Sequence, residues 1–288
     1  MTTKYFRIID NGRVECLLCP HHCKMAEGKA GICRSRRNVG GVLVSEAYGH
    51  PCALAVDPVE KKPLYHFHPG TKCLSIACTG CNFRCLNCQN HDISQVRPSD
   101  VRGYDLTPEE VVQICIEQKC PGIAYTYTEP LTYLEYVIDT AKLARQHGLW
   151  NILVTAGYIC TEPLNDLLPW LDAANIDLKS FSDDIYRKVS GGDLQTVLNT
   201  ILAMRDAGVW IELTNLLIPG VNDDMDMIRR MCRWIVENHL EGAPLHFSRF
   251  FPQYRLKNVP PTPIDTLKQA RQIAIEEGIH HVYLGNVY

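Results

Sequence analysis

The sequence predicts an α/β protein, a partial (β/α)6 barrel of the TIM type with a small N-terminal cysteine-rich cap. Two observations predict this fold. Strand-like and helix-like segments alternate about six times after residue 70, whereas the preceding segment lacks this rhythm and carries closely spaced cysteines. Right-handed crossovers between parallel strands curl such a sheet. A complete eight-fold barrel needs roughly 250 residues, more than this stretch provides, so the barrel should be incomplete.

Each element has its own boundary signals. The first strand is predicted at 73–80. Thr107 as N-cap, Pro108 at the first helical position and Glu110 as the capping-box acid open the helix that follows. Further strands are expected near 122–128, 150–156, 174–179, 210–220, 244–250 and 281–286, with helices near 131–147, 162–172, 193–207, 223–238 and 263–277. We therefore expect a cap and connector over 1–70 and the barrel over 71–288.

Composition and charge narrow the class of protein. The chain has 288 residues, 46% of them hydrophobic, and a net charge of −3, so no bulk basic surface for a nucleic-acid partner is expected. Its apolar runs are strand-sized, which argues against a membrane span. The first residues show no secretion signal, so we expect a cytoplasmic protein. In that reducing compartment, clustered cysteines more often bind metal than form disulfides.

The stretch "GCNFRCLNCQN" places Cys81, Cys85 and Cys88 in one short loop after the first predicted strand. Thiolates suit zinc or iron–sulfur clusters. A structural zinc site is closed by four protein ligands, whereas three cysteines can hold three irons of a [4Fe–4S] cluster and leave the fourth iron free. The alternative is a zinc site completed by Cys78, His91 or a distant residue.

A second group of cysteines precedes the barrel. Its members lie within eighteen residues and are Cys16, Cys19, Cys23 and Cys33. Four thiolates close a metal site, so a structural zinc ion or an auxiliary iron–sulfur cluster is expected here. Unmetallated thiols in a hairpin cap are the alternative.

The ordered motifs "LSIACTGCNFRCLNCQNHDISQ", "AYTYTEP" and "IDLKSF" resemble the radical S-adenosylmethionine (SAM) superfamily. Within it, the chain is similar to pyruvate formate-lyase activating enzymes, and more so to the radical SAM enzyme of the AmmeMemoRadiSam system. The resemblance implies an oxidoreductase with a [4Fe–4S] cluster on the three loop cysteines. Such an enzyme reductively cleaves SAM to a 5′-deoxyadenosyl radical that abstracts hydrogen from a substrate.

The resemblance also implies residues that contact SAM. Glu129, with Thr128 beside it, would receive the methionine ammonium group; the alternative is a helix N-terminal acid. Asp177 and Lys179 would contact the ribose and methionine, or form a plain ion pair. His246 would lie near the ribose, or be a buried core histidine. Asn87 stands where the family usually has an aromatic residue, so only its backbone is expected to contact adenine.

The implied partners are SAM, an electron donor such as flavodoxin or ferredoxin, and a substrate. That substrate would be a glycyl position on a partner enzyme or an AmmeMemoRadiSam-system substrate, with a Memo-like or AMMECR-like partner. Two other functions remain open. One is a zinc-stabilised binding module without catalysis, and the other is radical SAM modification of RNA, which the negative net charge disfavours.

Overall fold

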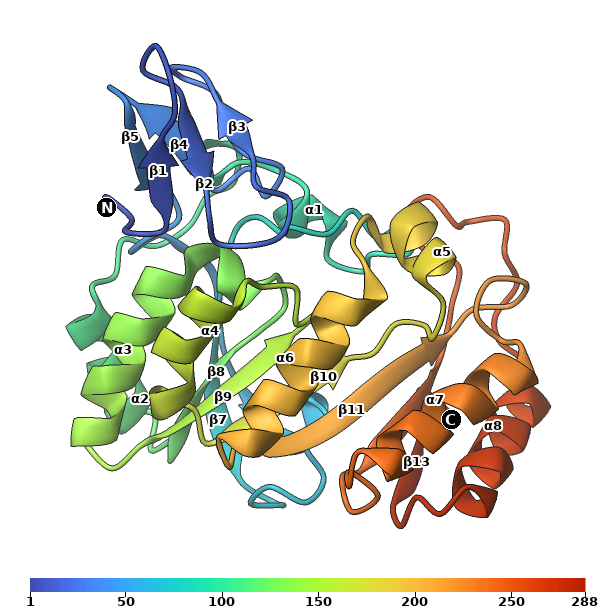
Figure 1. Ribbon diagram of the computed structural model, residues 1–288. Helices are drawn as coiled ribbons and strands as arrows, with labels where there is room; N and C mark the ends of the chain where they lie inside the picture. Colours follow the sequence, from blue (N-terminus) through green and yellow to red (C-terminus); the bar gives the residue numbers. More distant parts are fainter. Residues whose placement is uncertain (288) are drawn as a thin grey trace.

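An eight-stranded sheet forms the centre of the computed structural model, which describes residues 1–287 (Figure 1). Seven consecutive strands, β7 to β13, are parallel and neighbour one another in chain order, while β6 pairs antiparallel with β7. The strands are β6 (Pro51–Pro58), β7 (Lys72–Cys78), β8 (Gly122–Tyr125), β9 (Trp150–Thr155), β10 (Ala173–Asp177), β11 (Trp210–Leu217), β12 (Leu245–Arg249) and β13 (Val282–Gly285). This order confirms the predicted partial barrel.

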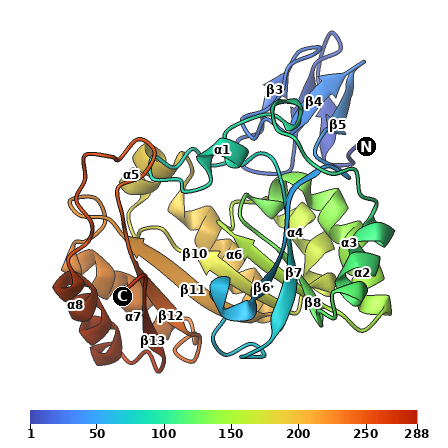
Figure 2. The same cartoon turned by 180° about the vertical axis from the view of Figure 1, so that it is seen from behind.

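Helices connect the parallel strands and cover the outer face of the sheet (Figure 1). They are α1 (His91–Ser94), α2 (Pro108–Glu117), α3 (Leu134–Gln146), α4 (Thr161–Leu167), α5 (Asp183–Ile185), α6 (Leu194–Asp206), α7 (Met225–Glu237) and α8 (Ile264–Glu276). The view from behind looks onto the opposite face of the sheet, where no helix crosses β10 and β11 (Figure 2).

Local sequence explains these elements. The predicted capping box of α2 is present, because Thr107 Oγ1 accepts from Glu110 N and the Glu110 carboxylate accepts from Thr107 N. The central strands are buried on both faces, as in β8, where every residue is buried. Strand β8 ends earlier than predicted, because Tyr127 has a φ of 64°. Residues of a β-strand have negative φ values, so the strand cannot extend through Tyr127.

The cap consists of two small antiparallel sheets above the barrel in Figure 1. One contains β1 (Phe6–Ile8), β2 (Val14–Cys16) and β3 (Lys24–Met25), and the other β4 (Arg36–Val39) and β5 (Val42–Ser45). Buried Arg36 joins the cap to the barrel: its Nε donates to the carbonyl of Thr132, and its terminal nitrogens contact Glu135 of α3.

Residues 51–58, expected in the connector, form strand β6 at the edge of the barrel sheet. An extended strand satisfies its backbone groups by pairing with β7, which a loop would not do. The structural change from cap to barrel sheet therefore occurs before residue 51, whereas the expected boundary at residue 70 stays a prediction. Within residues 1–287, no helix is long and apolar enough to cross a membrane.

Candidate active site at the barrel mouth

The cysteine loop leaves the carboxyl end of β7, at the edge of the sheet where active sites of such barrels gather. Gly80 starts the loop with a φ of 103°, and a Cβ there would lie 2.5 Å from the carbonyl oxygen of Cys33. Only glycine fits both demands. The loop is held from the other side, because Arg84 N donates to Ser190 O at 2.7 Å and Leu86 N to Val189 O at 3.0 Å.

Two of the three loop thiols lie close to hydrogen-bonding groups. Phe83 N donates to Cys81 Sγ at 3.3 Å, and Cys88 Sγ lies 3.2 Å from Ser94 Oγ. Burial raises the pKa of Cys81 and of Cys85. The Glu129 carboxylate raises the pKa of Cys81 further, whereas the Lys179 ammonium opposes the rise in the pKa of Cys85. The loop cysteines and these two charged groups therefore share one electrostatic environment.

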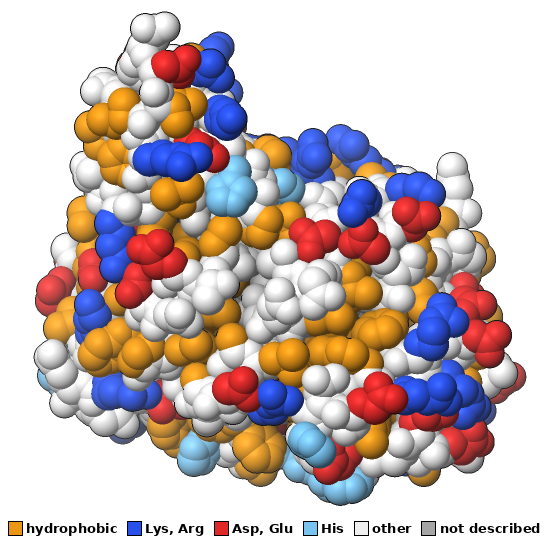
Figure 3. Space-filling model, in the orientation of Figure 1, with side chains coloured by type: hydrophobic (Ala, Val, Ile, Leu, Met, Phe, Trp, Pro, Cys, Tyr) orange, Lys and Arg blue, Asp and Glu red, His pale blue; other side chains and the backbone are white. Residues whose placement is uncertain are grey.

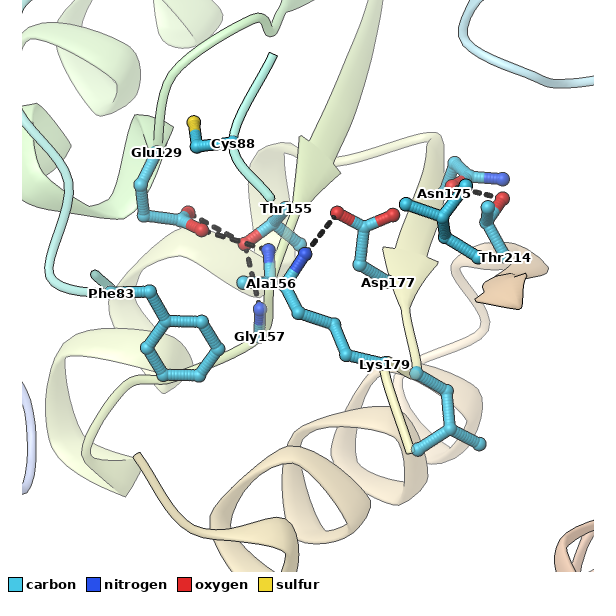
Figure 4. Close-up of polar contacts among 12 residues, drawn as sticks. Phe83, Cys88, Glu129, Thr155, Ala156, Gly157, Asn175, Asp177, Lys179 and Thr214 are labelled. Carbon is cyan, nitrogen blue, oxygen red and sulfur yellow. Dashed lines mark hydrogen bonds and ion pairs between the residues drawn. The ribbon is translucent and has the colours of Figure 1, made fainter. Parts of the chain in front are cut away.

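Glu129 follows β8 and is buried under three hydrogen-bond donors. Its Oε1 accepts from Thr155 Oγ1 at 2.6 Å and from Leu131 N at 3.2 Å, and its Oε2 accepts from Ala156 N at 2.8 Å (Figure 4). Burial raises the pKa of Glu129 to about 7, although these hydrogen bonds oppose the rise. The hydrogen bonds thus hold the Glu129 carboxylate in place as an acceptor, and a nearby cation would stabilise its buried negative charge.

Asp177 ends β10 and pairs with Lys179, whose Nζ lies 2.7 Å from Asp177 Oδ2 (Figure 4). The Lys179 backbone is held at both ends, since its N–H donates to Tyr186 Oη at 3.0 Å and its carbonyl accepts from Asn222 Nδ2 at 2.6 Å. Burial would lower the pKa of the ammonium, but Asp177 outweighs burial and the pKa is raised. Lys179 therefore stays charged at the mouth.

Thr128 and Asn87 lie beside these groups. Thr128 Oγ1 donates to the carbonyl of Cys78 at 2.6 Å, so its hydroxyl ties the Glu129 segment to the end of β7. Asn87 is half-buried in the loop directly before Cys88. The structure therefore brings five of the predicted residues, or their backbone, to the same edge as the three cysteines.

The donor set of this loop fits a cluster with one free iron. The loop supplies three thiols and an N–H donor to sulfur, and hydrogen bonds of that kind tune iron–sulfur centres. Among residues 1–287, no three His, Cys, Asp or Glu side chains form a ready-made site for a metal ion.

A sequence profile described as the radical SAM superfamily matches residues 75–232. The chain belongs to this superfamily. The matched residues include the cysteine loop, Glu129, Asp177 and Lys179. Membership accounts for the three-cysteine loop, because radical SAM proteins use a [4Fe–4S] cluster together with SAM.

Several relatives extend the comparison. An uncharacterised protein of Methanocaldococcus jannaschii is 48% identical over 283 residues, which are 98% of this chain and 84% of that protein. The pyruvate formate-lyase-activating enzyme of Clostridium pasteurianum is 26% identical over 62% of this chain and 80% of its own length. The Escherichia coli pyruvate formate-lyase 1-activating enzyme is 24% identical over 69% and 87%, respectively.

Solved structures confirm the fold of this radical SAM chain. A domain of the pyruvate-formate lyase-activating enzyme of Bacteroides vulgatus superposes with a TM-score of 0.51 and 19% identity over 57% of this chain and 99% of that one. Streptococcus suis SuiB bound to S-adenosylmethionine superposes with a TM-score of 0.57 and 9% identity over 72% of this chain and 48% of SuiB.

His246 is held by a neighbouring carboxylate inside the barrel. It is the second residue of β12, near the amino end of the strand, and its Nε2 lies 2.7 Å from Glu212 Oε2. Tyr65, from the segment before β7, packs against its ring at 4.7 Å between centroids. His246 is 2% exposed and is level with Asp177 in the sheet, because it pairs with Thr214, which pairs with Asp177. The expected contact with the ribose stays a prediction.

The structure brings the four cap cysteines together around one small pocket. Cys16, Cys19, Cys23 and Cys33 all line it, with Arg36 and Asn82 among the other lining residues. Cys23 Sγ accepts from Ile32 N at 3.4 Å. Because no three ligand side chains within residues 1–287 form a ready-made metal site, the metal expected at these cysteines stays a prediction.

Sequence reasoning missed the residues that orient the site. Thr155, at the end of β9, holds the Glu129 carboxylate and accepts from Gly157 N at 2.9 Å. Tyr186 supplies the hydroxyl that fixes the Lys179 backbone. The available signal was the Thr-Ala-Gly run after a buried strand, because such runs at carboxyl ends of barrel strands line active sites.

Proposed function

We propose that this chain is a radical SAM oxidoreductase of the activating-enzyme type. Cys81, Cys85 and Cys88 would hold three irons of a [4Fe–4S] cluster, and SAM would chelate the fourth. When bound, the reduced cluster supplies an electron that cleaves SAM to methionine and a 5′-deoxyadenosyl radical, which abstracts hydrogen from the substrate. One observation carries the proposal: the three-cysteine loop, a buried carboxylate and a Lys–Asp pair occupy the same edge of the barrel.

The charges of this chain match the polar groups of SAM. The buried Glu129 carboxylate would accept from the methionine ammonium group, because a cation relieves the cost of burying its charge. Lys179 would pair with the methionine carboxylate, and Asp177 would accept from a ribose hydroxyl. Asn87 would contact the adenine edge through its backbone, and Thr128 would keep the Glu129 segment beside the loop.

The names of the relatives favour a protein substrate. Two of them are pyruvate formate-lyase-activating enzymes. We propose either a glycyl position on a partner enzyme or a substrate of the AmmeMemoRadiSam system with a Memo-like or AMMECR-like partner. A flavodoxin or ferredoxin would donate electrons in the cytoplasm. Figure 3 shows acidic and basic side chains interspersed over one face, which does not favour RNA as substrate.

We also propose that Cys16, Cys19, Cys23 and Cys33 hold a metal. Their convergence on one pocket supports this, because four thiolates complete a coordination shell.

The function is tested on protein purified and reconstituted without air. Incubation with SAM and dithionite should release 5′-deoxyadenosine, and Cys85→Ala should abolish that release together with the SAM-induced change in the EPR spectrum of the reduced cluster. Cys232→Ala, a buried thiol of α7 outside both cysteine groups, is the control. Colourless protein with stoichiometric zinc would instead support a non-catalytic binding module and refute the proposal.

A further inference from the structure

Tyr127 joins strand β8 to the Glu129 segment through a strained turn. Its φ is 64°, and Thr128 N donates to the carbonyl of Thr126 at 2.8 Å. A hydrogen bond between residues two apart, around a residue of positive φ, forms a γ-turn of the rare and strained kind. A bulky aromatic residue seldom adopts this backbone conformation, whereas glycine adopts it without a steric cost. Tyrosine therefore occupies a position that glycine would fill with less strain.

The turn sets the direction in which the chain leaves β8. Before it, Thr126 N still pairs with a carbonyl of β7, at 3.0 Å. After it, Thr128 Oγ1 donates to the carbonyl of Cys78, at the end of the same strand. The chain thus stays beside β7 up to the cysteine loop. Because Glu129 comes next, the orientation of its carboxylate depends on the γ-turn at Tyr127.

Two side chains hold this turn. Asn90 Nδ2 donates to the carbonyl of Tyr127 at 2.7 Å, and the Tyr127 hydroxyl donates to Asp57 Oδ2. Asn90 follows Cys88, the last cysteine of the loop, by two residues. Asp57 belongs to β6, the antiparallel strand at the edge of the sheet (Figure 2). Strained backbone persists where the surrounding structure over-determines it, and these two bonds constrain the turn in that way.

Asp57 is a fixed anchor for the phenol. It is buried, and its two carboxylate oxygens also accept from Lys61 Nζ and Lys62 Nζ, each at 2.7 Å. Burial would raise the pKa of Asp57, but the hydrogen bonds from both lysines and from Tyr127 outweigh burial and lower the pKa. The carboxylate has two cationic partners without the phenol. The bond therefore matters more for holding Tyr127 than for satisfying Asp57.

The anchor lies far from the cysteine loop. Asp57 pairs with Cys73 near the start of β7, whereas the loop follows the end of that strand. At about 3.3 Å per residue, the two points are about 16 Å apart. Asp57 is thus too distant to contact a cluster on the loop cysteines, and it acts on the site only through Tyr127.

We propose that Tyr127 is a positioning residue of the SAM site: anchored on Asp57 and Asn90, it holds the γ-turn that orients the Glu129 carboxylate toward the methionine ammonium group. The inference rests on the proposed radical SAM function. Without the phenol anchor, the strained turn relaxes and the Glu129 carboxylate loses its fixed direction. Edge strand β6 thereby contributes to SAM affinity, although Asp57 is remote from the loop cysteines.

Substitutions at this one position test the role. Tyr127→Phe removes only the hydroxyl and keeps the unfavourable φ, whereas Tyr127→Gly removes the whole ring and relieves the strain. The dissociation constant for SAM is measured without air by EPR titration of the reduced cluster, and iron content checks that the cluster is retained. We expect Tyr127→Phe to weaken SAM binding about tenfold and Tyr127→Gly to weaken it less. If Tyr127→Gly fails to fold, Tyr127→Asn replaces it, because asparagine also tolerates a positive φ.

A residue that only packs would give the opposite order. Loss of the ring would then weaken SAM binding more than loss of the hydroxyl. An affinity in Tyr127→Gly equal to or below that of Tyr127→Phe, or wild-type affinity in Tyr127→Phe, would overturn the inference. Tyr48→Phe is the matched control and should bind SAM like wild type, because Tyr48 donates a similar hydrogen bond to Asp139 of the outer helix α3, at 2.8 Å.

A double-mutant cycle shows whether Tyr127 acts through Glu129. In the Glu129→Gln background, Tyr127→Phe should weaken SAM binding no further, because the carboxylate that the turn orients is already gone. An additional loss of more than about twofold would show that Tyr127 acts independently of Glu129 and would refute the positioning role.

Failure of this inference and failure of the proposed function give different results. If SAM does not change the EPR spectrum of the reduced wild-type cluster, the radical SAM proposal itself fails. If wild type binds SAM and Tyr127→Phe binds it equally well, only the role of Tyr127 fails.

Discussion

Arg36 of the cap donates hydrogen bonds from both terminal nitrogens to the two carboxylate oxygens of Glu135 in α3, at 3.0 and 2.5 Å. The side chain of Arg36 is 1% exposed and that of Glu135 10%. The same guanidinium also donates to Thr3 Oγ1 and to the carbonyl of Thr132. All its nitrogens are therefore satisfied at the junction between cap and barrel.

Removing Arg36 should destabilise the protein strongly. Arg36→Leu leaves Glu135 buried without its partner, which costs about 3–5 kcal/mol in the free energy of unfolding. Denaturant unfolding followed by circular dichroism measures this loss. Arg37→Ala is the matched control, because Arg37 pairs with Glu46 at the surface and such pairs contribute about 1 kcal/mol or less. Equal losses in the two variants would contradict the prediction.

The same pair should make stability depend on pH. Burial opposes the charge of Glu135, but Arg36 outweighs burial and lowers the pKa of this carboxyl below 4.5. A lowered folded pKa stabilises the fold above the unfolded pKa, and this contribution is lost as pH falls through the folded value. The difference in unfolding free energy between wild type and Arg36→Leu should therefore shrink as pH falls from roughly 5 to roughly 2. A constant difference across this range would show that Glu135 is not the titrating partner.

Glu129→Gln should weaken SAM binding while leaving the cluster in place. The amide has one acceptor oxygen where the carboxylate has two, and it lacks the charge that would attract the ammonium group. We expect the dissociation constant for SAM to rise about tenfold or more, measured anaerobically by EPR titration. The exposed Glu162→Gln in α4 is the control and should bind SAM like wild type.

Lys179→Met should also weaken SAM binding, because it removes the cation placed for the methionine carboxylate and leaves Asp177 without its partner at 2.7 Å. Lys188→Met is the control, because it makes the same substitution at an exposed position near Asp184, away from the barrel mouth. An equal affinity for SAM in the two variants would argue against Lys179 as a contact. Iron content checks that the cluster is retained in both.

His246→Phe should affect stability rather than SAM. The substitution removes the hydrogen bond to buried Glu212 and leaves that carboxylate with fewer donors, which costs about 1–3 kcal/mol in unfolding free energy. Because the His246 ring is buried against Tyr65 and its Nε2 is taken by Glu212, SAM affinity should stay within about twofold of wild type. A large loss of affinity with unchanged stability would place His246 in the SAM site after all.

Local signals predicted much of the fold. The order of strands and helices, the capping box at Thr107 and the strand-end positions of Glu129 and Asp177 all follow from patterns within a few residues. Strand β6 did not follow from them, because its pairing with β7 depends on the open edge of a sheet already formed. The hydrogen bond between His246 and Glu212 has the same cause, because it joins neighbouring strands that are far apart in the sequence.

The sequence by itself determined the parallel sheet, the three-cysteine loop and the existence of a second cysteine group, because spacing and periodicity are local properties of the chain. Only the tertiary structure decided that Arg36 locks the cap to α3 and that Asn82 forms a wall of the cap pocket beside Cys81. Those contacts join residues far apart in sequence, and they form only when the packed barrel brings the surfaces together.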